Sequence, residues 1–403
     1  MSDVFRPKPD EEINHLNTKE ETKTVSVNPI NLTSENSMDK LKEITDKLEQ
    51  GIKDIFNSDK YKEYLKVMSR FHNYSWGNSL LIAMQKPDAS YVAGYTAWQN
   101  KFKRTVLKGE KGIKIIAPSP YKVKLESYKL DPITNEKLLD KDGKPIVEVK
   151  EKSIPSFKVV SVFDVSQTEG KELPDITVDM LTGTVENFND IYSSIESISP
   201  VPITLEPLKK DLYGYFSHIE KRIVVNDRLS ELHTLKTMIH ELAHAKLHGK
   251  EPDVPKDEKQ DLPDKRTREV EAESVAYTVC NHFGLDTSDY SFGYIAGWSS
   301  NKELNELKKS VDRICTTSAE IINGIEDMYS EIQKQKNAEI VNENNLSVNE
   351  RIERGEVVSI MDMIQEVADA SKKPSIRKQL NSEKQKISQT QTQTKNKKQD
   401  LEV

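Results

Sequence analysis

The stretch TMIHELAHAKLH, residues 237–248, decides how the second half of the chain folds. It places His240 and His244 four residues apart, which on a helix means one turn and one face. Two imidazoles at that spacing can hold one zinc ion at roughly 2.0–2.1 Å. Glu241 lies about 100° round the helix from His240, so its carboxylate can reach a water molecule beside the ion. The flanking apolar residues predict a buried helix. The pattern therefore predicts a zinc site with two histidine ligands and Glu241 as catalytic carboxylate.

The sequence offers a third metal ligand in REVEAESVAY, residues 268–277, which reads as a second helix. Glu269 and Glu273 are four residues apart and share one helix face. This resembles the glutamate zincins such as thermolysin, in which a glutamate in an E-x-x-A or E-x-x-x-D setting completes the site. Glu269 fits because Ala272 follows it by three residues. We expect Glu269 to bind the ion and Glu273 to support a ligand histidine by a hydrogen bond. Glu271 is the rival ligand, and a solvated acidic face is the alternative to both.

His248 is a further histidine on the first helix. It lies about 12 Å along the helix axis from His240, too far for both to join His244 on one ion, so we expect a structural or cleft role. The predicted site then has three protein ligands and one open position, which is typical of catalytic zinc. In such a site Glu241 takes a proton from water, and the reaction expected is hydrolysis of a peptide bond.

Composition limits the class of protein. A chain of 403 residues predicts two or three domains, and its net charge of -7 argues against indiscriminate nucleic-acid binding. The two cysteines, Cys280 and Cys315, do not make a disulfide framework and favour a reducing compartment. The N-terminus lacks the apolar core of a signal peptide, and the chain has no apolar run of about 18 residues. We expect a cytoplasmic protein without a membrane segment.

The pattern of polar and apolar residues predicts an α+β protein. The expected parts are a disordered arm at 1–36, an α+β domain at 37–170 with a hairpin insertion at about 121–153, a zincin-like α+β domain at 171–300, a charged helix at 301–335 and a mostly disordered tail at 336–403. The expected elements are helices at 37–68, 75–86 and 265–282, strands at 91–95, 113–116 and 157–163, and a hairpin of 213–216 with 222–225.

A basic loop stands beside aromatic residues in the first half. Residues 101–114 hold six basic side chains and one acid, and Trp98 precedes them, while Tyr74 lies in an aromatic segment upstream. Rings that stack on bases and lysines that follow phosphates make a single-strand nucleic-acid surface. The alternative interpretation is that the aromatic residues belong to the core and the lysines to a solvated face.

The same segments carry a resemblance to a known family. The runs FHNYSWGNSLLIAMQKP (71–87), VAGYTAWQNKFKRTVLKGEKGIKIIAP (92–118) and IPSFKVVSVFDVSQTEG (154–170) resemble the N-terminal domain of ArdC-type antirestriction proteins, a single-stranded DNA-binding module of plasmids and conjugative elements. HELAHAKLHG and REVEAESVAY look like the metallopeptidase domain paired with it, which is similar to the ImmA/IrrE metallopeptidases. With the basic loop, the candidate DNA contacts are Tyr74, Asn78, Trp98, Lys103, Arg104, Lys108 and Lys111.

The resemblance implies a function. We expect a protein of a mobile element that binds single-stranded DNA, protects incoming DNA from restriction, and carries a zinc-dependent metallopeptidase-like domain with a peptide or protein substrate. The alternative is an ImmA/IrrE-like regulatory zinc endopeptidase that cleaves a repressor. A third interpretation is an inactive zinc domain that serves as a scaffold.

Overall fold

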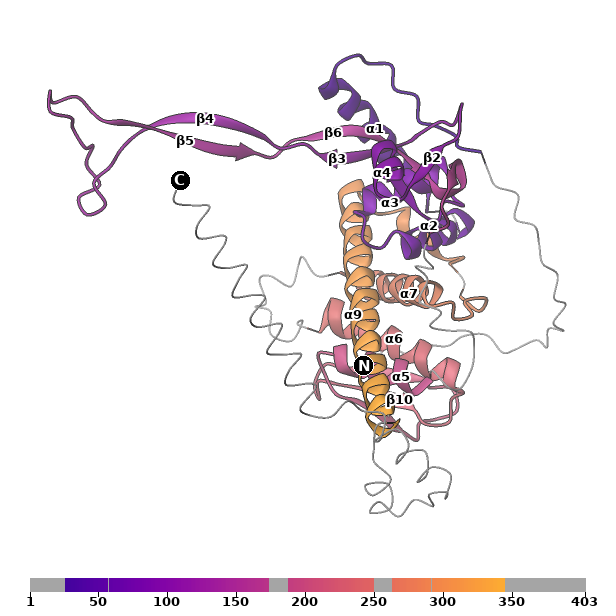
Figure 1. Cartoon of the computed structure of the whole chain (residues 1–403). Coiled ribbons are helices and arrows are strands. Elements are labelled where there is room, and N and C mark those ends of the chain that lie inside the picture. The colour runs from indigo at the N-terminus through magenta and orange to yellow at the C-terminus, as the bar shows by residue number, and fades with distance from the viewer. Residues whose placement is uncertain (1–25, 57, 174–187, 250–262, 291, 345–403) are drawn as a thin grey trace, which may run out of the picture. The chain divides into compact units, whose positions relative to one another are not determined.

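The computed structural model describes residues 26–56, 58–173, 188–249, 263–290 and 292–344, and it shows the predicted α+β class of fold (Figure 1). The helices are α1 (Ser37–Asp54), α2 (Ser58–Arg70), α3 (Trp76–Gln85), α4 (Tyr95–Asn100), α5 (Phe188–Ile198), α6 (Glu231–His248), α7 (Lys265–His282), α8 (Ile295–Ser299) and α9 (Leu304–Asn344), with a 3-10 turn, η1, at Val165–Gln167. The strands are β1 (Val92–Gly94), β2 (Arg104–Val106), β3 (Ile113–Pro118), β4 (Tyr121–Tyr128), β5 (Val147–Ile154), β6 (Phe157–Asp164), β7 (Thr168–Gly170), β8 (Ile203–Glu206), β9 (Gly214–Ser217) and β10 (Arg222–Asn226).

The single helix predicted at 37–68 is wrong, because the segment forms two helices. Asn36 caps α1 by accepting a hydrogen bond from the Asp39 amide, and α1 ends at Asp54 before α2 begins at Ser58. Each helix buries apolar side chains of its own, among them Ile44 and Ile52 of α1 and Leu65 and Met68 of α2. The helix predicted at 75–86 is confirmed as α3, which starts with Ser75 as its cap.

The first sheet is antiparallel with strand order β1-β6-β3, so β3 lies at an edge. Helix α3 runs along that edge and pairs with it through two side-chain amides. Asn78 donates to the Ile116 carbonyl at 2.8 Å and accepts from the Ile116 amide at 2.9 Å. Gln85, two turns later, makes the same pair of bonds with Lys114, both at 2.9 Å. The helix therefore satisfies an edge that would otherwise be open to another strand.

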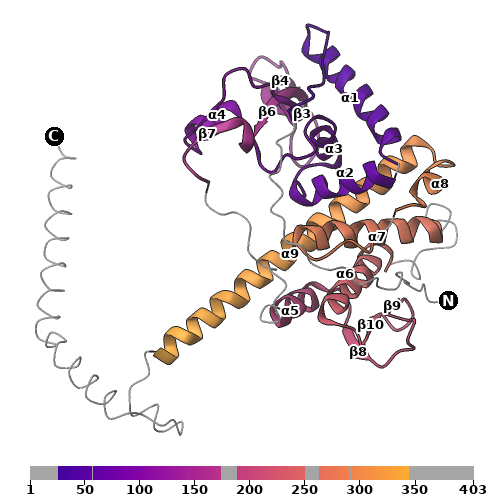
Figure 2. The same cartoon turned by 90° about the vertical axis from the view of Figure 1, so that its right-hand side faces the viewer.

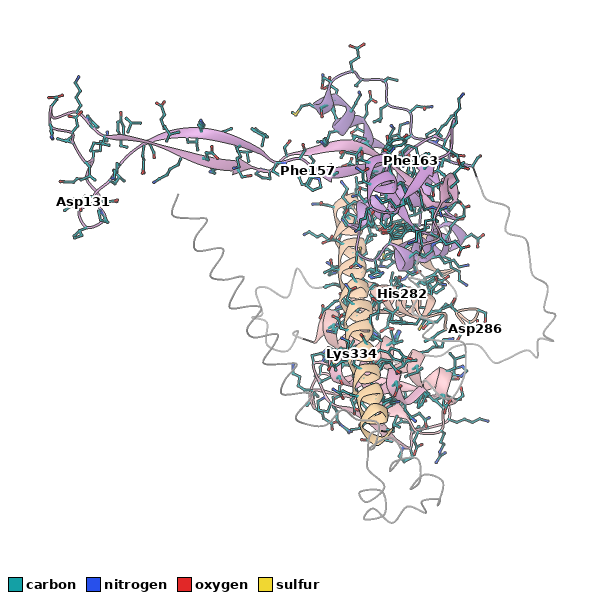
Figure 3. All side chains as sticks on the ribbon, viewed as in Figure 1. Asp131, Phe157, Phe163, His282, Asp286 and Lys334 are labelled. Carbon is teal, nitrogen blue, oxygen red and sulfur yellow. The ribbon has the colours of Figure 1, made fainter. Side chains whose placement is uncertain are left out.

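The hairpin predicted at about 121–153 is confirmed. β4 and β5 pair antiparallel from Tyr121↔Ile154 to Tyr128↔Val147, and this register continues the β3–β6 pairing, in which Pro118 lies opposite Phe157. We call the segment Tyr121–Ile154 the ribbon. Figure 3 labels Phe157 at the end of the ribbon nearer the sheet and Asp131 near the tip. Among the described residues, most of the exposed large apolar side chains belong to this segment.

The second sheet has strand order β8-β10-β9, in which β8 and β10 are parallel and β9 and β10 antiparallel. The predicted hairpin of 213–216 and 222–225 is confirmed as β9 and β10. Helix α6 packs on both of these strands, and α7 packs along α6 (Figure 2). The helix predicted at 265–282 is confirmed as α7 with the same bounds.

One hydrophobic core joins these elements. It includes side chains of α1, α2 and α3 together with those of α5 to α9 and the second sheet. Helix α9 covers the expected charged helix, but it buries an apolar stripe that includes Val311, Ile314 and Ile325. The arm before residue 26 and the tail beyond 344 lie outside the described residues. Among the described residues, no helix is both long enough and apolar enough to cross a membrane.

Candidate metal centre

Helix α6 carries the HExxH residues into the interior. Ser230 begins the helix by accepting a hydrogen bond from the His233 amide. The residues from Thr234 to Ala245 are buried without interruption, because α6 lies between the second sheet and α7. His240, Glu241 and His244 are all among them. An uninterrupted buried face explains how three polar side chains come to lie in an apolar interior.

The two histidines and Glu269 of α7 converge on one point. The Nε2 atoms of His240 and His244 are 3.2 Å apart. The Glu269 carboxylate lies 3.6 Å from His244 Nε2 and 4.0 Å from His240 Nε2. Two donors bound to zinc at about 2.0–2.2 Å in a tetrahedron are roughly 3.4 Å apart. The donor set, two imidazole nitrogens and one carboxylate, therefore fits a divalent cation in both chemistry and spacing.

The electrostatics of His240 also suit a metal ligand. Burial, with a further contribution from the neighbouring His244, lowers the pKa of His240 to about 3, although Glu269 acts in the opposite direction. The imidazole is therefore neutral at physiological pH, and a neutral imidazole is the form that donates a lone pair to a metal.

Glu241 lies beside the edge strand β9. A Cβ placed on Gly214 would lie 2.6 Å from Thr237 Cγ2 and 3.5 Å from Glu241 Cγ. The β9 backbone therefore approaches α6 so closely that only glycine fits at this position. This close approach sets the distance between the Glu241 side chain and the edge of the sheet.

Glu271, the rival ligand, points to a different partner. Its side chain has 0% exposure, and it accepts hydrogen bonds from Ser310 Oγ at 2.5 Å and from the Arg313 guanidinium at 3.1 Å, both on α9. His248, at the end of α6, has its Nε2 3.8 Å from the same carboxylate. Burial lowers the pKa of His248 to about 3. Glu271 and His248 thus link α6, α7 and α9. Neither residue belongs to the donor group of His240, His244 and Glu269.

Glu273 has a different neighbour from the one expected for it. Its carboxylate accepts a hydrogen bond from Tyr294 Oη, in the segment that leads into α8. Burial raises the pKa of Glu273 to about 7; the bond from Tyr294 opposes this shift and the nearby Glu269 adds to it. Glu269 and Glu273 thus lie on one side of α7, as their spacing predicts. Glu269 faces the two histidines, whereas Glu273 faces Tyr294.

The structure divides the candidate DNA contacts into buried and exposed groups. Trp98 has 0% exposure and donates its indole N–H to the Phe163 carbonyl at 2.9 Å, so its ring belongs to the core. Its assignment to an exposed stacking surface is corrected accordingly. Tyr74 is half-buried and packs edge-on against Phe71. Asn78 pairs with β3, as described above, and therefore has a structural task.

Arg104 is also held by the fold. Its guanidinium donates to the Thr168 hydroxyl at 2.7 Å, to the Thr168 carbonyl at 2.8 Å and to the Lys171 carbonyl at 2.6 Å. These bonds tie β2 to β7. Lys103, Lys108 and Lys111, here called the loop lysines, are exposed. Of the predicted basic contacts, the loop lysines are thus the ones that face solvent.

A buried glutamine fixes the loop that carries two of these lysines. Gln167 donates to the Glu110 carboxylate at 2.7 Å and to the Lys111 carbonyl at 2.9 Å. Asp164 accepts from the Ser90 amide at 2.8 Å and the Tyr91 amide at 3.0 Å, which anchors the start of η1. Residues 108–112 and 163–168, which lie within the resemblance runs 92–118 and 154–170, therefore form one structural unit.

Sequence reasoning did not single out Tyr95. This residue begins α4, is 53% exposed and packs edge-on against Phe163. Tyr95 and Trp98 are three residues apart on one short helix, where one ring turns inward and the other stays in solvent. The sequence contains both aromatic residues, but it does not indicate which of the two rings is exposed.

Comparison with known families agrees with this arrangement. Residues 35–163 match the model of the N-terminal domain of anti-restriction factor ArdC, and residues 200–280 match the IrrE N-terminal-like domain of the M78 peptidases. The chain is an ArdC-type protein with a peptidase-like domain. The second match includes the α6 histidines and Glu269, so the convergent donors lie inside the peptidase-like segment.

Individual proteins similar to this ArdC-type protein include one from Bacillus anthracis and one from plasmid R388. An uncharacterized Bacillus anthracis protein, pXO2-81, is 32% identical over 327 residues, which is 75% of this chain and 54% of that protein. The chain thus spans about half the length of that relative. The antirestriction protein ArdC of plasmid R388 is similar in its metal-free form, with 18% identity, a TM-score of 0.38, and coverage of 63% of this chain and 85% of that one. Its Mn(II)-bound form gives 16% identity, a TM-score of 0.37, and coverage of 63% and 84%.

Proposed function

We propose that this protein binds a divalent metal, Zn²⁺, through His240, His244 and Glu269, and uses Glu241 as the catalytic base of a peptidase-like site. The observation that carries the proposal is the convergence of the three donors, whose separations of 3.2, 3.6 and 4.0 Å suit one tetrahedral ion. Three protein ligands leave a fourth position for water or substrate, as in catalytic zinc sites.

The residues divide the chemistry between them. A divalent cation held by His240, His244 and Glu269 would supply Lewis acidity and would lower the pKa of a water molecule. Glu241 is buried beside the donors without being one of them, so its carboxylate can take a proton from the nucleophilic water and pass it to the leaving amine. The edge strand β9 runs next to Glu241, which suits a substrate backbone in extended conformation.

The N-terminal half is proposed to bind single-stranded DNA, and the whole protein to act in antirestriction on a mobile element. The ArdC-type match supports this proposal, as do the exposed loop lysines, two of which (Lys108 and Lys111) lie on a loop that Gln167 holds in place. Tyr95 takes the stacking role that had been assigned to Trp98, because its ring is exposed. DNA contact through lysines and one aromatic ring is not expected to read sequence.

Two measurements on purified protein test the metal site. Native protein should contain about one equivalent of zinc by elemental analysis, and His244→Ala should lose it. Glu241→Gln should retain the zinc and cleave peptide at least about 100-fold more slowly than native protein, because only the base is removed. Native zinc content in His244→Ala would refute the ligand assignment, and native cleavage by Glu241→Gln would refute the role of the base.

A second candidate function is regulatory cleavage of a repressor protein, which the IrrE-like match favours. The same Glu241→Gln variant separates the two functions. If protection of incoming DNA from restriction survives in that variant, protection does not depend on peptidase chemistry. If protection and cleavage disappear together while zinc and DNA binding persist, the peptidase reaction belongs to the protective function.

A further inference from the structure

The strand pair β3–β6 continues into the ribbon, and the protection of its outer edge ends at Pro120. Within the sheet, the outward-facing amides of Lys114 and Ile116 are satisfied by side chains of α3. The next outward positions are Pro118 and Pro120, which have no amide hydrogen. Proline and covering groups are the usual means by which edge strands avoid other strands. From Lys114 to Pro120, therefore, this edge offers no free outward amide to another strand.

The continuation of the same edge in β4 lacks that protection. The bonds from the Ser119 amide to the Ser156 carbonyl at 2.7 Å and from the Lys129 amide to the Ile146 carbonyl at 2.8 Å show that odd-numbered residues of β4 bond across the ribbon. The even-numbered residues of β4 therefore direct their amides and carbonyls outward. Among the described elements, β5 alone pairs with β4, so this outward edge has no strand partner there.

Both faces of the ribbon are also exposed. Tyr121, Leu125 and Tyr128 of β4 are 52%, 46% and 48% exposed, and β5 exposes Val147 and Val149. A two-stranded hairpin by itself is marginally stable in water, and apolar residues gathered on a surface mark interaction sites. The ribbon therefore has the properties of a sheet that gains strands from a partner.

The charge of the ribbon argues against nucleic acid as the partner. Residues 121–154 contain eight lysines against seven carboxylates, so the charge is almost balanced. Binding to phosphates requires an excess of positive charge. A mixed pattern of both signs is better suited to another polypeptide strand with the opposite order of charges.

The β4 sequence supplies that opposite order when it is read backwards. If β4 pairs antiparallel with β4 of a second copy about a twofold axis at Leu125, Lys124 lies opposite Glu126 of the other copy, and the same pair occurs twice. Lys122 then lies opposite Tyr128, which allows a lysine–ring contact of the type that Lys137 already makes with the Tyr128 ring at 3.9 Å.

This register also uses the outward backbone groups. The pairs 122–128 and 124–126 join even-numbered residues, which are the ones whose amides and carbonyls face outward, so these pairs can exchange hydrogen bonds between copies. Leu125 falls on the axis in a pair that is not hydrogen-bonded and meets its own copy. We infer that the β4 edge is a self-association surface, through which two chains form a four-stranded sheet in the order β5-β4-β4-β5.

A cysteine scan of the full-length protein tests the register. Opposite residues in a pair that is not hydrogen-bonded have Cα atoms about 4.5 Å apart, within the span of a disulfide. Leu125→Cys should give a covalent dimer of twice 46.0 kDa under mild oxidation. The matched control is Val123→Cys on the same face, where the two cysteines would lie about 14 Å apart and should not join. The native Cys280 and Cys315 are buried and should not compete.

A charge exchange gives a second test without cysteine. Sedimentation of native protein should show a dimer. Lys124→Glu should weaken self-association at least about tenfold, because it places like charges opposite each other twice. Combining it with Glu126→Lys should restore the native dimer, and Lys150→Glu on β5 is the control that should leave the dimer unchanged.

Three results would overturn the inference. These are a monomer at all concentrations together with no crosslink through Leu125→Cys, a crosslink through Val149→Cys on β5 in place of Leu125→Cys, and a double charge exchange that fails to restore what Lys124→Glu removed.

Discussion

The two glutamates on either side of Val270 should fail in opposite ways when replaced. Glu271 has 0% exposure and is bound by Arg313 and Ser310. Removing one partner of a buried ion pair costs about 3–5 kcal/mol. The Arg313 side chain is 36% exposed, so water can reach the guanidinium that is left behind. We therefore expect Glu271→Ala to lower the free energy of unfolding by the smaller value, about 3 kcal/mol.

Glu269→Ala should show the converse. The Glu269 side chain is 32% exposed and faces the two histidines, so its loss should change the unfolding free energy of the metal-free protein by less than about 1 kcal/mol. Zinc content should fall sharply in this variant and stay near one equivalent in Glu271→Ala. Urea unfolding of EDTA-treated protein measures stability without the metal, since a ligand at 100 times its Kd alone adds about 2.7 kcal/mol.

The opposite pattern would refute the reasoning. If Glu271→Ala loses zinc while Glu269→Ala retains it, the ligand is Glu271, and the contacts with α9 do not describe the metal-bound protein. If Glu271→Ala costs less than about 1 kcal/mol, the Arg313 pair contributes little, and the burial of this carboxylate has another cause.

Three further outcomes follow from the structure. Gly214→Val should lower the free energy of unfolding by about 1–3 kcal/mol in urea titration, because the new Cβ would overlap Thr237. Asn78→Ala should cost about 1–3 kcal/mol and speed hydrogen exchange of the Ile116 amide, which loses its partner on the β3 edge. Replacing the three loop lysines by alanine should reduce the slope of log affinity for single-stranded DNA against log salt by about 2, at roughly 0.7 per phosphate contact; an unchanged slope would place the DNA elsewhere.

The α6 part of the site could be predicted from sequence because its geometry is local. Two histidines four residues apart share a face on any helix, and the apolar residues around them predict that the helix is buried. The choice between Glu269 and Glu271 is not local. These residues point to different sides of α7, and the identity of each side depends on what packs there. Glu271 faces Arg313, which lies 42 residues further along the chain on α9.

The same distinction explains the errors in the first half. Tyr95 and Trp98 are both aromatic, so the sequence alone does not indicate which ring is buried. In the structure the Trp98 ring is buried and donates to the Phe163 carbonyl, and the Tyr95 ring is exposed. The resemblance to the ArdC domain makes Asn78 a candidate DNA contact, a role that needs a side chain facing solvent. Its target, the backbone of Ile116 on an edge strand, has no signature in the sequence. Motifs shared with a family can therefore record how a fold is held together as well as what it binds.

Helix α7 connects the two halves that the sequence presents as separate domains. Near its start it directs Glu269 toward the histidines, and further along it contacts α2, where Tyr61 Oη and Ser274 Oγ form a buried hydrogen bond at 2.8 Å. At its end, Asn281 accepts a hydrogen bond from Ser69 of α2 at 2.9 Å. A helix is stiff over this length, so the packing of the N-terminal half sets the direction from which Glu269 approaches His240 and His244. Separate expression of the peptidase-like segment would remove that support along with the N-terminal half.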